Sequence, residues 1–126
     1  MLQSTSNMAE EIAQAAIAFQ PQLTGHKPKS VSVAIFGETL VITLRGALSP
    51  AEQAMAQRPE AAKVREFHRR LFLAGSETLR QDIQRITGLV VLEDAAEVFL
   101  ASGTMVQLFL LAGKLPSESV DGESTS

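Results

Sequence analysis

The densest group of side chains that could do chemistry is the segment KVREFHRR at Lys63–Arg70, which holds four cations and a histidine. On a helix, Arg65 and Arg69 share an outward face, which His68 can join, because residues three and four apart lie on one side. Such a face can bind an acidic tail, a carboxyl terminus or a phosphate. The alternative is a solvated helix face held by ion pairs within the helix, which is the commoner arrangement.

A second basic group precedes a predicted strand and contains His26, Lys27 and Lys29. If this group lies near Arg69, the two form a shared anion pocket, but the sequence alone does not place them together. The two histidines have no partner at the spacing of known metal motifs, so we expect no metal site. A two-histidine site closed by Glu66 or Asp82 is the weaker alternative.

Neither pair of adjacent carboxylates, Glu10-Glu11 or Glu93-Asp94, is arranged for acid–base catalysis, because neighbouring side chains diverge on a helix or a strand. The chain also lacks a nucleophile-elbow motif, a phosphate-binding glycine loop and any cysteine. We therefore expect a protein that is not an enzyme and that carries no cofactor.

Composition narrows the class of partner further. The net charge of −3 and the absence of Trp and Tyr argue against a nucleic-acid or anionic-membrane binder. The N-terminus lacks a secretory signal, and the most apolar stretch, Met105–Gly113, is far shorter than the roughly 20 residues that span a membrane. We expect a cytoplasmic protein without direct membrane insertion.

The predicted elements begin with a short amphipathic helix from Ser6 that ends near Pro21. A hairpin follows, with Gly37 and Glu38 as its turn, because this register sets three apolar pairs opposite one another on one face. The other face of the hairpin is more mixed and carries Phe36 and Val41. The apolar pairs are Ile35 with Leu40, Val33 with Ile42, and Val31 with Leu44.

Ser49-Pro50-Ala51-Glu52 is a capping box that predicts a helix start, and Pro59 should break this helix. A long amphipathic helix then runs from Glu60 to a C-cap at Gly88. Within it, Gly75 marks either a close crossing or an interruption. The expected apolar face consists of Val64, Phe67, Leu71, Gly75, Leu79, Ile83 and Ile86.

The last predicted unit is a second hairpin with its turn near Ser102-Gly103, in which Met105–Gly113 is a buried strand. The predicted fold is α+β, in the order α-β-β-α-β-β, with a four-stranded antiparallel sheet and helices packed on one face. Residues 1–113 form this single domain. Residues 114–126, rich in Ser, Glu and Gly, are expected to be a disordered acidic tail.

The stretch GHKPKSVSVAIFGETLVITLRGALSPAE, followed by AAKVREFHRRLF and LRQDIQRITGLVV, resembles the bacterial MpsC-like family over about Gly25 to Leu110. Where that family often has a His-Ser-Asp-like segment, this chain reads Ala95-Ala96-Glu97. The resemblance implies a membrane-potential-generating system associated with cation-coupled bicarbonate uptake, in which this component is a soluble accessory. Small assembly factors of the carbon-concentrating machinery are a further, weaker resemblance.

The leading hypothesis is therefore an adaptor or assembly chaperone that binds a segment of a partner protein in inorganic-carbon uptake or carboxysome assembly. The alternative is a small-ligand or ion-sensing regulatory subunit. The apolar excess of the mixed hairpin face and of VQLFLLAG favours a homodimer formed through a sheet face or edge. The residues expected to contact a partner are His26, Lys27, Lys29, Phe36, Val41, Arg65, His68 and Arg69.

Overall fold

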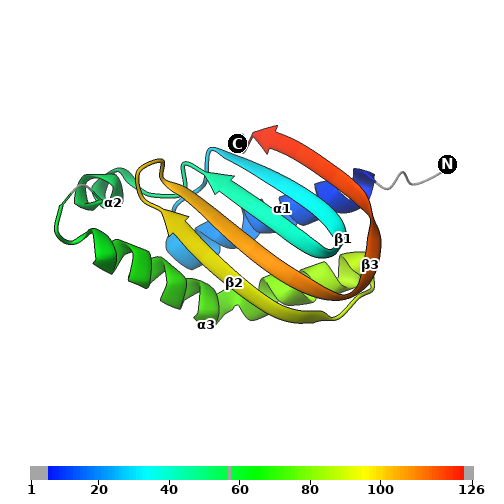
Figure 1. The fold of residues 1–126 in the computed structure, drawn as a ribbon. Helices are drawn as coiled ribbons and strands as arrows, with labels where there is room; N and C mark the ends of the chain where they lie inside the picture. The colour runs from blue at the N-terminus through cyan, green and yellow to red at the C-terminus, as the bar shows by residue number, and fades with distance from the viewer. Residues whose placement is uncertain (1–5, 57, 124–126) are drawn as a thin grey trace.

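The computed structural model describes residues 6–56 and 58–123 as two long helices packed against a twisted sheet (Figure 1). The strands are antiparallel, in the order β1-β3-β2. The predicted α+β class and the antiparallel sheet are confirmed, but the sheet has three strands where we expected four. The elements are α1 (Ser6–Thr24), β1 (Ser30–Arg45), α2 (Pro50–Met55), α3 (Ala61–Thr87), β2 (Val91–Phe99) and β3 (Thr104–Glu123).

The strand count differs because the predicted first hairpin is one continuous strand, β1, which bends back on itself and pairs with β3 on both sides of the bend. A straight strand of 16 residues would hold its ends about 50 Å apart. Instead, the backbone N–H of Lys29 donates to the carbonyl of Arg45 at 2.8 Å, so the two ends lie side by side (Figure 1). Gly37, at the bend, has a φ of 55°, which only glycine adopts cheaply, and Glu38 does not have a positive φ. This agrees with the expected hairpin turn at Gly37-Glu38.

Strand β3 follows the bend of β1 and runs around its tip. Residues 105–110 pair with the second half of β1 (39–44), and residues 115–123 pair with the first half (30–37), with irregularities on either side of Gly37. Lys114–Glu123 therefore belong to a strand, where we expected a disordered tail; residues 124–126 of that tail lie outside the described residues. The polar composition of this segment does not indicate a strand. The segment still forms one, because main-chain hydrogen bonds to β1 do not depend on apolar side chains.

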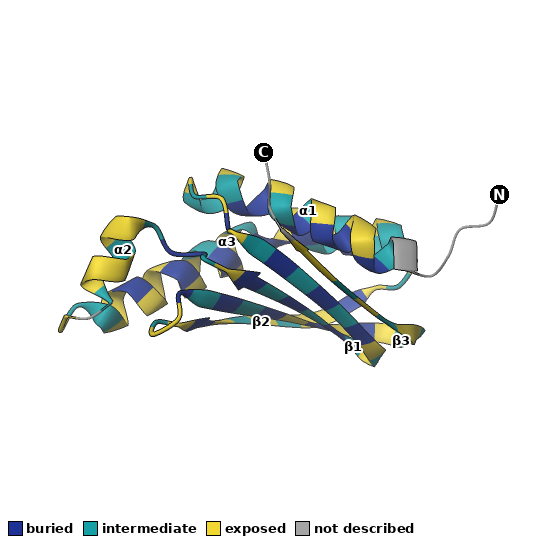
Figure 2. Ribbon diagram, turned by 90° about the horizontal axis from the view of Figure 1, so that it is seen from above, coloured by how far each residue is buried: buried dark blue, intermediate teal, exposed yellow. Residues whose placement is uncertain are grey.

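The core lies between the sheet and the two long helices, which cover one face only (Figure 2). Strand residues alternate along β1, so that every second side chain is buried against the helices. The three predicted apolar pairs of β1 all lie on this buried face. They are joined there by Phe109 of β3, Val98 of β2, and Ile12, Ala16 and Phe19 of α1.

Helix α3 is amphipathic, as predicted, but its N-terminal half is turned relative to the expected face. Phe72 is fully buried, whereas Phe67 is 53% exposed. The buried positions include His68 and Ser76. Because their side chains are polar, the apolar pattern did not place them on the buried face. The full set of buried residues in α3 is Val64, His68, Phe72, Ser76, Leu79 and Ile83.

Two details of the helices resolve open points. Helix α1 continues through Pro21 to Thr24 and stops at Gly25, which has a φ of 77° and donates its N–H to the Pro21 carbonyl at 2.7 Å. The expected end at Pro21 was wrong, since a proline in the last turns removes only one hydrogen bond. Gly75 marks a close crossing, because a Cβ there would lie 2.5 Å from Cδ1 of Leu23 in α1.

The orientation of α3 can be tested with two phenylalanines on the same helix. Replacing the buried Phe72 by alanine should lower the free energy of unfolding by about 3–5 kcal/mol, because it leaves a cavity against Phe109. The matched Phe67→Ala change should cost less than about 1 kcal/mol. Urea unfolding followed by circular dichroism measures both. Equal losses, or a larger loss at Phe67, would contradict the observed face.

Candidate functional site

The one close histidine–carboxylate pair among the described residues joins α2 to α3. Ser49 and Glu52 form the predicted capping box: Ser49 N–H donates to Glu52 Oε1 at 2.9 Å, and Glu52 N–H donates to Ser49 Oγ at 3.3 Å. The second carboxylate oxygen of Glu52 lies 2.7 Å from Nε2 of His68, whose side chain is fully buried. One carboxylate thus caps the start of α2 and also ties α2 to the N-terminal part of α3.

The partners of Glu52 favour the charged form of its carboxylate. Burial alone would raise the pKa of Glu52, but the Ser49 backbone hydrogen bond and the pairing with His68 outweigh it, so its pKa lies below the ordinary value. Because His68 faces the protein interior, it does not join Arg65 and Arg69 on an outward face. The expected contact role of His68 finds no support in this position.

The four cations of the KVREFHRR segment lie on an exposed face of α3. Arg65 and Arg69 are exposed. Arg69 and Arg70 both reach Glu66, with Nη1–Oε1 and Nε–Oε2 distances of 3.6 and 3.0 Å. Exposed pairs of this kind contribute little to stability or to specific binding. The commoner interpretation of the KVREFHRR segment therefore fits its geometry.

The two basic groups are not brought together. Arg69 lines a cavity of about 210 Å³ between α3 and β2, together with Leu73 and residues 94–97. Lys29 lies beside the end of β1, and Nε2 of His26 lies 3.1 Å from the Gly46 carbonyl oxygen. Strand β3 separates these two sides of the sheet. The shared anion pocket considered from the sequence does not form.

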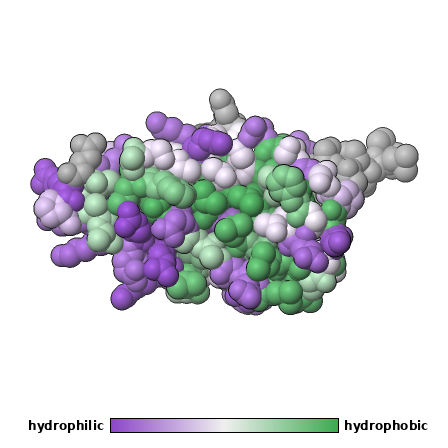
Figure 3. All heavy atoms as spheres, viewed as in Figure 1, coloured by the Kyte–Doolittle hydropathy of each residue, from purple (hydrophilic) through white to green (hydrophobic). Residues whose placement is uncertain are grey.

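The face of the sheet that points away from the helices is open and apolar. Phe36 is 66% exposed there and Val41 is partly exposed, as the hairpin register predicts. Leu108 and Leu110 of β3, 41% and 42% exposed, show where the apolar excess of VQLFLLAG lies. Figure 3 shows apolar side chains gathered in a band across the middle of this face. We call Phe36, Val41, Leu108 and Leu110 the open-face patch.

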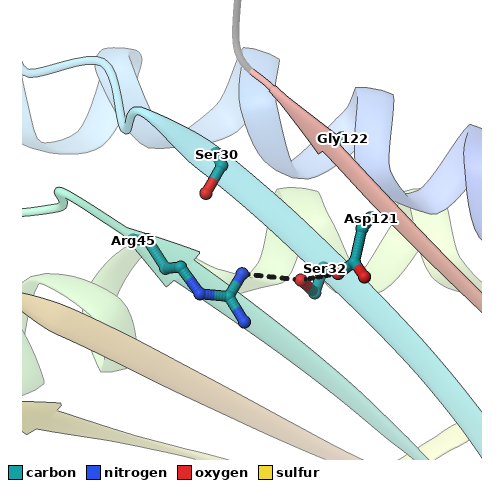
Figure 4. Close-up of a pocket in the computed structure, with 5 residues that line it drawn as sticks. All are labelled: Ser30, Ser32, Arg45, Asp121 and Gly122. Carbon is teal, nitrogen blue, oxygen red and sulfur yellow. Dashed lines mark hydrogen bonds between the residues drawn. The ribbon is translucent and has the colours of Figure 1, made fainter.

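A polar cavity of about 300 Å³ lies at one end of the same face, lined by Ser30, Ser32, Arg45, Asp121 and Gly122 (Figure 4). Nη1 of Arg45 donates to Oγ of Ser32 at 2.7 Å, and the Ser32 hydroxyl donates to the carboxylate of Asp121. The sequence did not indicate this cluster, because Ser32 and Asp121 are far apart along the chain. Only the pairing of β1 with the end of β3 brings them together.

The described part of the chain contains neither a candidate metal site nor a candidate membrane span. Across residues 6–56 and 58–123, no group of three or more His, Asp or Glu side chains could hold a metal ion. Within the same ranges, none of the helices combines the length and apolar composition needed to cross a membrane.

Comparison with known proteins gives one family and one relative. The sequence model of the family described as "Na+-translocating membrane potential-generating system (MpsC)" matches residues 4–113. The chain is similar to the uncharacterized protein YbcI of Bacillus subtilis (strain 168), with 25% identity over 116 residues, which cover 91% of this chain and 94% of the relative. No solved structure matches the chain.

The link between Glu52 and His68 predicts a specific pH dependence. Because the pKa of Glu52 is lowered by folding, its carboxylate stabilises the protein above the ordinary glutamate pKa of about 4.3, and this stabilisation is lost as the pH falls through the lowered value. Glu52→Gln should therefore lower the free energy of unfolding at pH 7, and the difference from the wild type should shrink below about pH 4.

Urea unfolding between pH 3 and pH 7 measures this difference. Glu66→Gln is the matched control, since Glu66 forms only exposed pairs and its loss should have little effect at any pH. A difference for Glu52→Gln that is as large at pH 3 as at pH 7 would contradict the assigned role.

Proposed function

Because the chain belongs to the MpsC family, we propose that it is a non-catalytic, homodimeric adaptor that binds a partner protein in a system of the kind the family description names, a Na+-translocating membrane potential-generating system. The observation that carries this proposal is the open-face patch. Monomeric proteins rarely expose contiguous apolar surface of this kind without a binding role.

The open-face patch is continuous across the strands. Val41 of β1 lies opposite Leu108 of β3, which in turn lies opposite Ala95 of β2. In the neighbouring row, Thr39 lies opposite Leu110. A cavity of about 150 Å³ between Leu108, Leu110 and β2 gives this surface a shallow hollow. Such a surface suits packing against another flat apolar face.

The partner that fits this face best is a second copy of the chain. On the β2 side the open face carries Glu93 and Glu97, and on the β1 side Arg45 is paired through Ser32 with Asp121 of β3. A two-fold axis along β3, between two facing sheets, sets β2 of one copy over β1 of its partner. The two copies of Leu108 then meet near the axis, and the apolar rows of the two faces pack against each other.

The non-catalytic part of the proposal is supported by the state of the His68–Glu52 pair. A general base must reach its substrate, but the His68 side chain is fully buried and Glu52 already holds two partners.

Other expectations from the sequence stay predictions. The link to inorganic-carbon uptake, the assembly-chaperone role and the cytoplasmic location rest on the resemblance and on composition. The alternative role as an ion-sensing regulatory subunit also stays a prediction, since no specific feature of the described surface favours it over protein binding.

The dimer is tested by placing a charge at the centre of the open-face patch. Leu108→Glu should turn a dimer into a monomer at micromolar concentration, and should raise the dissociation constant by about 30-fold or more, because central interface positions contribute about 2 kcal/mol or more. Size-exclusion chromatography with light scattering measures both. Leu73→Glu is the matched control, because Leu73 is 60% exposed on α3, away from the patch. The Leu73→Glu protein should stay dimeric.

A wild-type protein that is strictly monomeric at these concentrations would refute the dimer. Dissociation by both changes alike would show that the leucine positions report general instability and not an interface. Circular dichroism of both variants confirms that the comparison is made between folded proteins.

A further inference from the structure

The outer edge of the first half of β1 is covered by the end of β3, residues 115–123. We propose that this edge is a binding site for an extended acidic segment of a partner protein, and that residues 115–123 occupy it in the free chain. The inference rests on the proposed function, because it names the chemistry of the partner that the adaptor binds.

The covering segment is held weakly by apolar contacts. Of its side chains, only Leu115 and Val120 pack against the core, and both are partly exposed. The segment also lies beyond residues 4–113, the part that matches the family. Its attachment therefore depends on backbone pairing, which any extended peptide can reproduce, and on a few polar contacts.

The first specific contact is made by Glu118 at the start of α1. Its Oε1 accepts a hydrogen bond of 3.0 Å from the backbone N–H of Ala9. The first turn of α1 contains no acidic residue of its own, so Glu118 supplies the negative charge that a helix N-terminus favours. This position on the edge selects a carboxylate that points toward the helices.

The second specific contact lies on the opposite face, three residues further along. Asp121 accepts a hydrogen bond from the Ser32 hydroxyl, which accepts one from Arg45 (Figure 4). Because side chains alternate along a strand, carboxylates three residues apart point to opposite faces. The edge thus binds a strand that carries two acidic side chains. One of them contacts the N-terminus of α1, and the other lies beside Arg45.

The fit of the chain's own segment is incomplete. Oε2 of Glu118 is buried and has no hydrogen-bond partner among the described residues. Two cavities, of about 300 and 240 Å³, lie along the same edge, and beside its two carboxylates the segment lines them with the small residues Gly122, Ser117 and Ser119. A partner strand with the same two carboxylates and a larger apolar side chain beside Phe36 would fill the second cavity. Such a strand can displace the internal one.

The proposal is tested by adding the segment in trans to the full chain. The probe is a fluorescently labelled peptide with the sequence KLPSESVDGE, residues 114–123, titrated by fluorescence polarisation. The internal segment competes with it, and the apparent affinity is reduced in proportion to the fraction of free edge. Glu118→Gln and Asp121→Asn in the protein should each tighten peptide binding by about tenfold, because each weakens only the internal competitor.

The same changes placed in the peptide should weaken binding to the Glu118→Gln protein by about tenfold. Glu66→Gln, an exposed acid of α3 away from the edge and the open face, is the matched control and should bind the peptide as the wild type does. Hydrogen exchange of the wild-type chain gives an independent measure: amides of residues 115–123 should exchange faster than those of residues 105–110.

Absence of peptide binding to the two protein variants, or equally slow exchange in both halves of β3, would overturn the proposal. Association of the variants with one another, reversed by the peptide, would also overturn it, since the occupant would then be a second copy and not a partner. Repeating the titration in the Leu108→Glu background separates the two proposals. If Glu118→Gln tightens peptide binding there as well, the acidic-strand site is supported whether or not the chain dimerises.

Discussion

The structure depends on the turn at Gly37. This turn decides which side chains of the two halves of β1 point to the same face of the sheet. Strand side chains alternate between faces, so a two-residue turn is what keeps both sets of aliphatic side chains on the same side. Helices α1 and α3 cover that side, and the other is left to the open-face patch (Figure 2). Since β3 stays antiparallel to both halves, it too must turn around the tip.

Features that depend on neighbouring residues could be predicted from the sequence. Four of these features depend on residues close together in the sequence. They are the apolar pairs of β1, the capping box of Ser49 and Glu52, the Gly88 cap of α3 and the turn at Gly103. The same holds for the place of Phe36 and Val41 on the open face, because their alternation with buried residues fixes it. In these cases local preference and tertiary packing agree.

Features that depend on distant partners could not be predicted. His68 interrupts an apolar pattern, and its burial makes sense only once Glu52, on another helix, lies 2.7 Å away. Residues 115–123 have the composition of a disordered tail, and they become a strand because β1 offers an unpaired edge. The cluster of Ser32, Arg45 and Asp121 arises from that pairing, so the candidate site at this edge has no sequence signature.

The pairing of Ser30 with Glu123 also has a consequence for how the chain folds. These contacts have a very long sequence separation, and closing so large a loop costs entropy before any pairing energy is gained. During synthesis on the ribosome, β1 is complete well before the residues that cover its edge exist. The nascent chain therefore carries a bare strand edge until residues 115–123 have been made, and that interval is when non-native β pairing competes with folding.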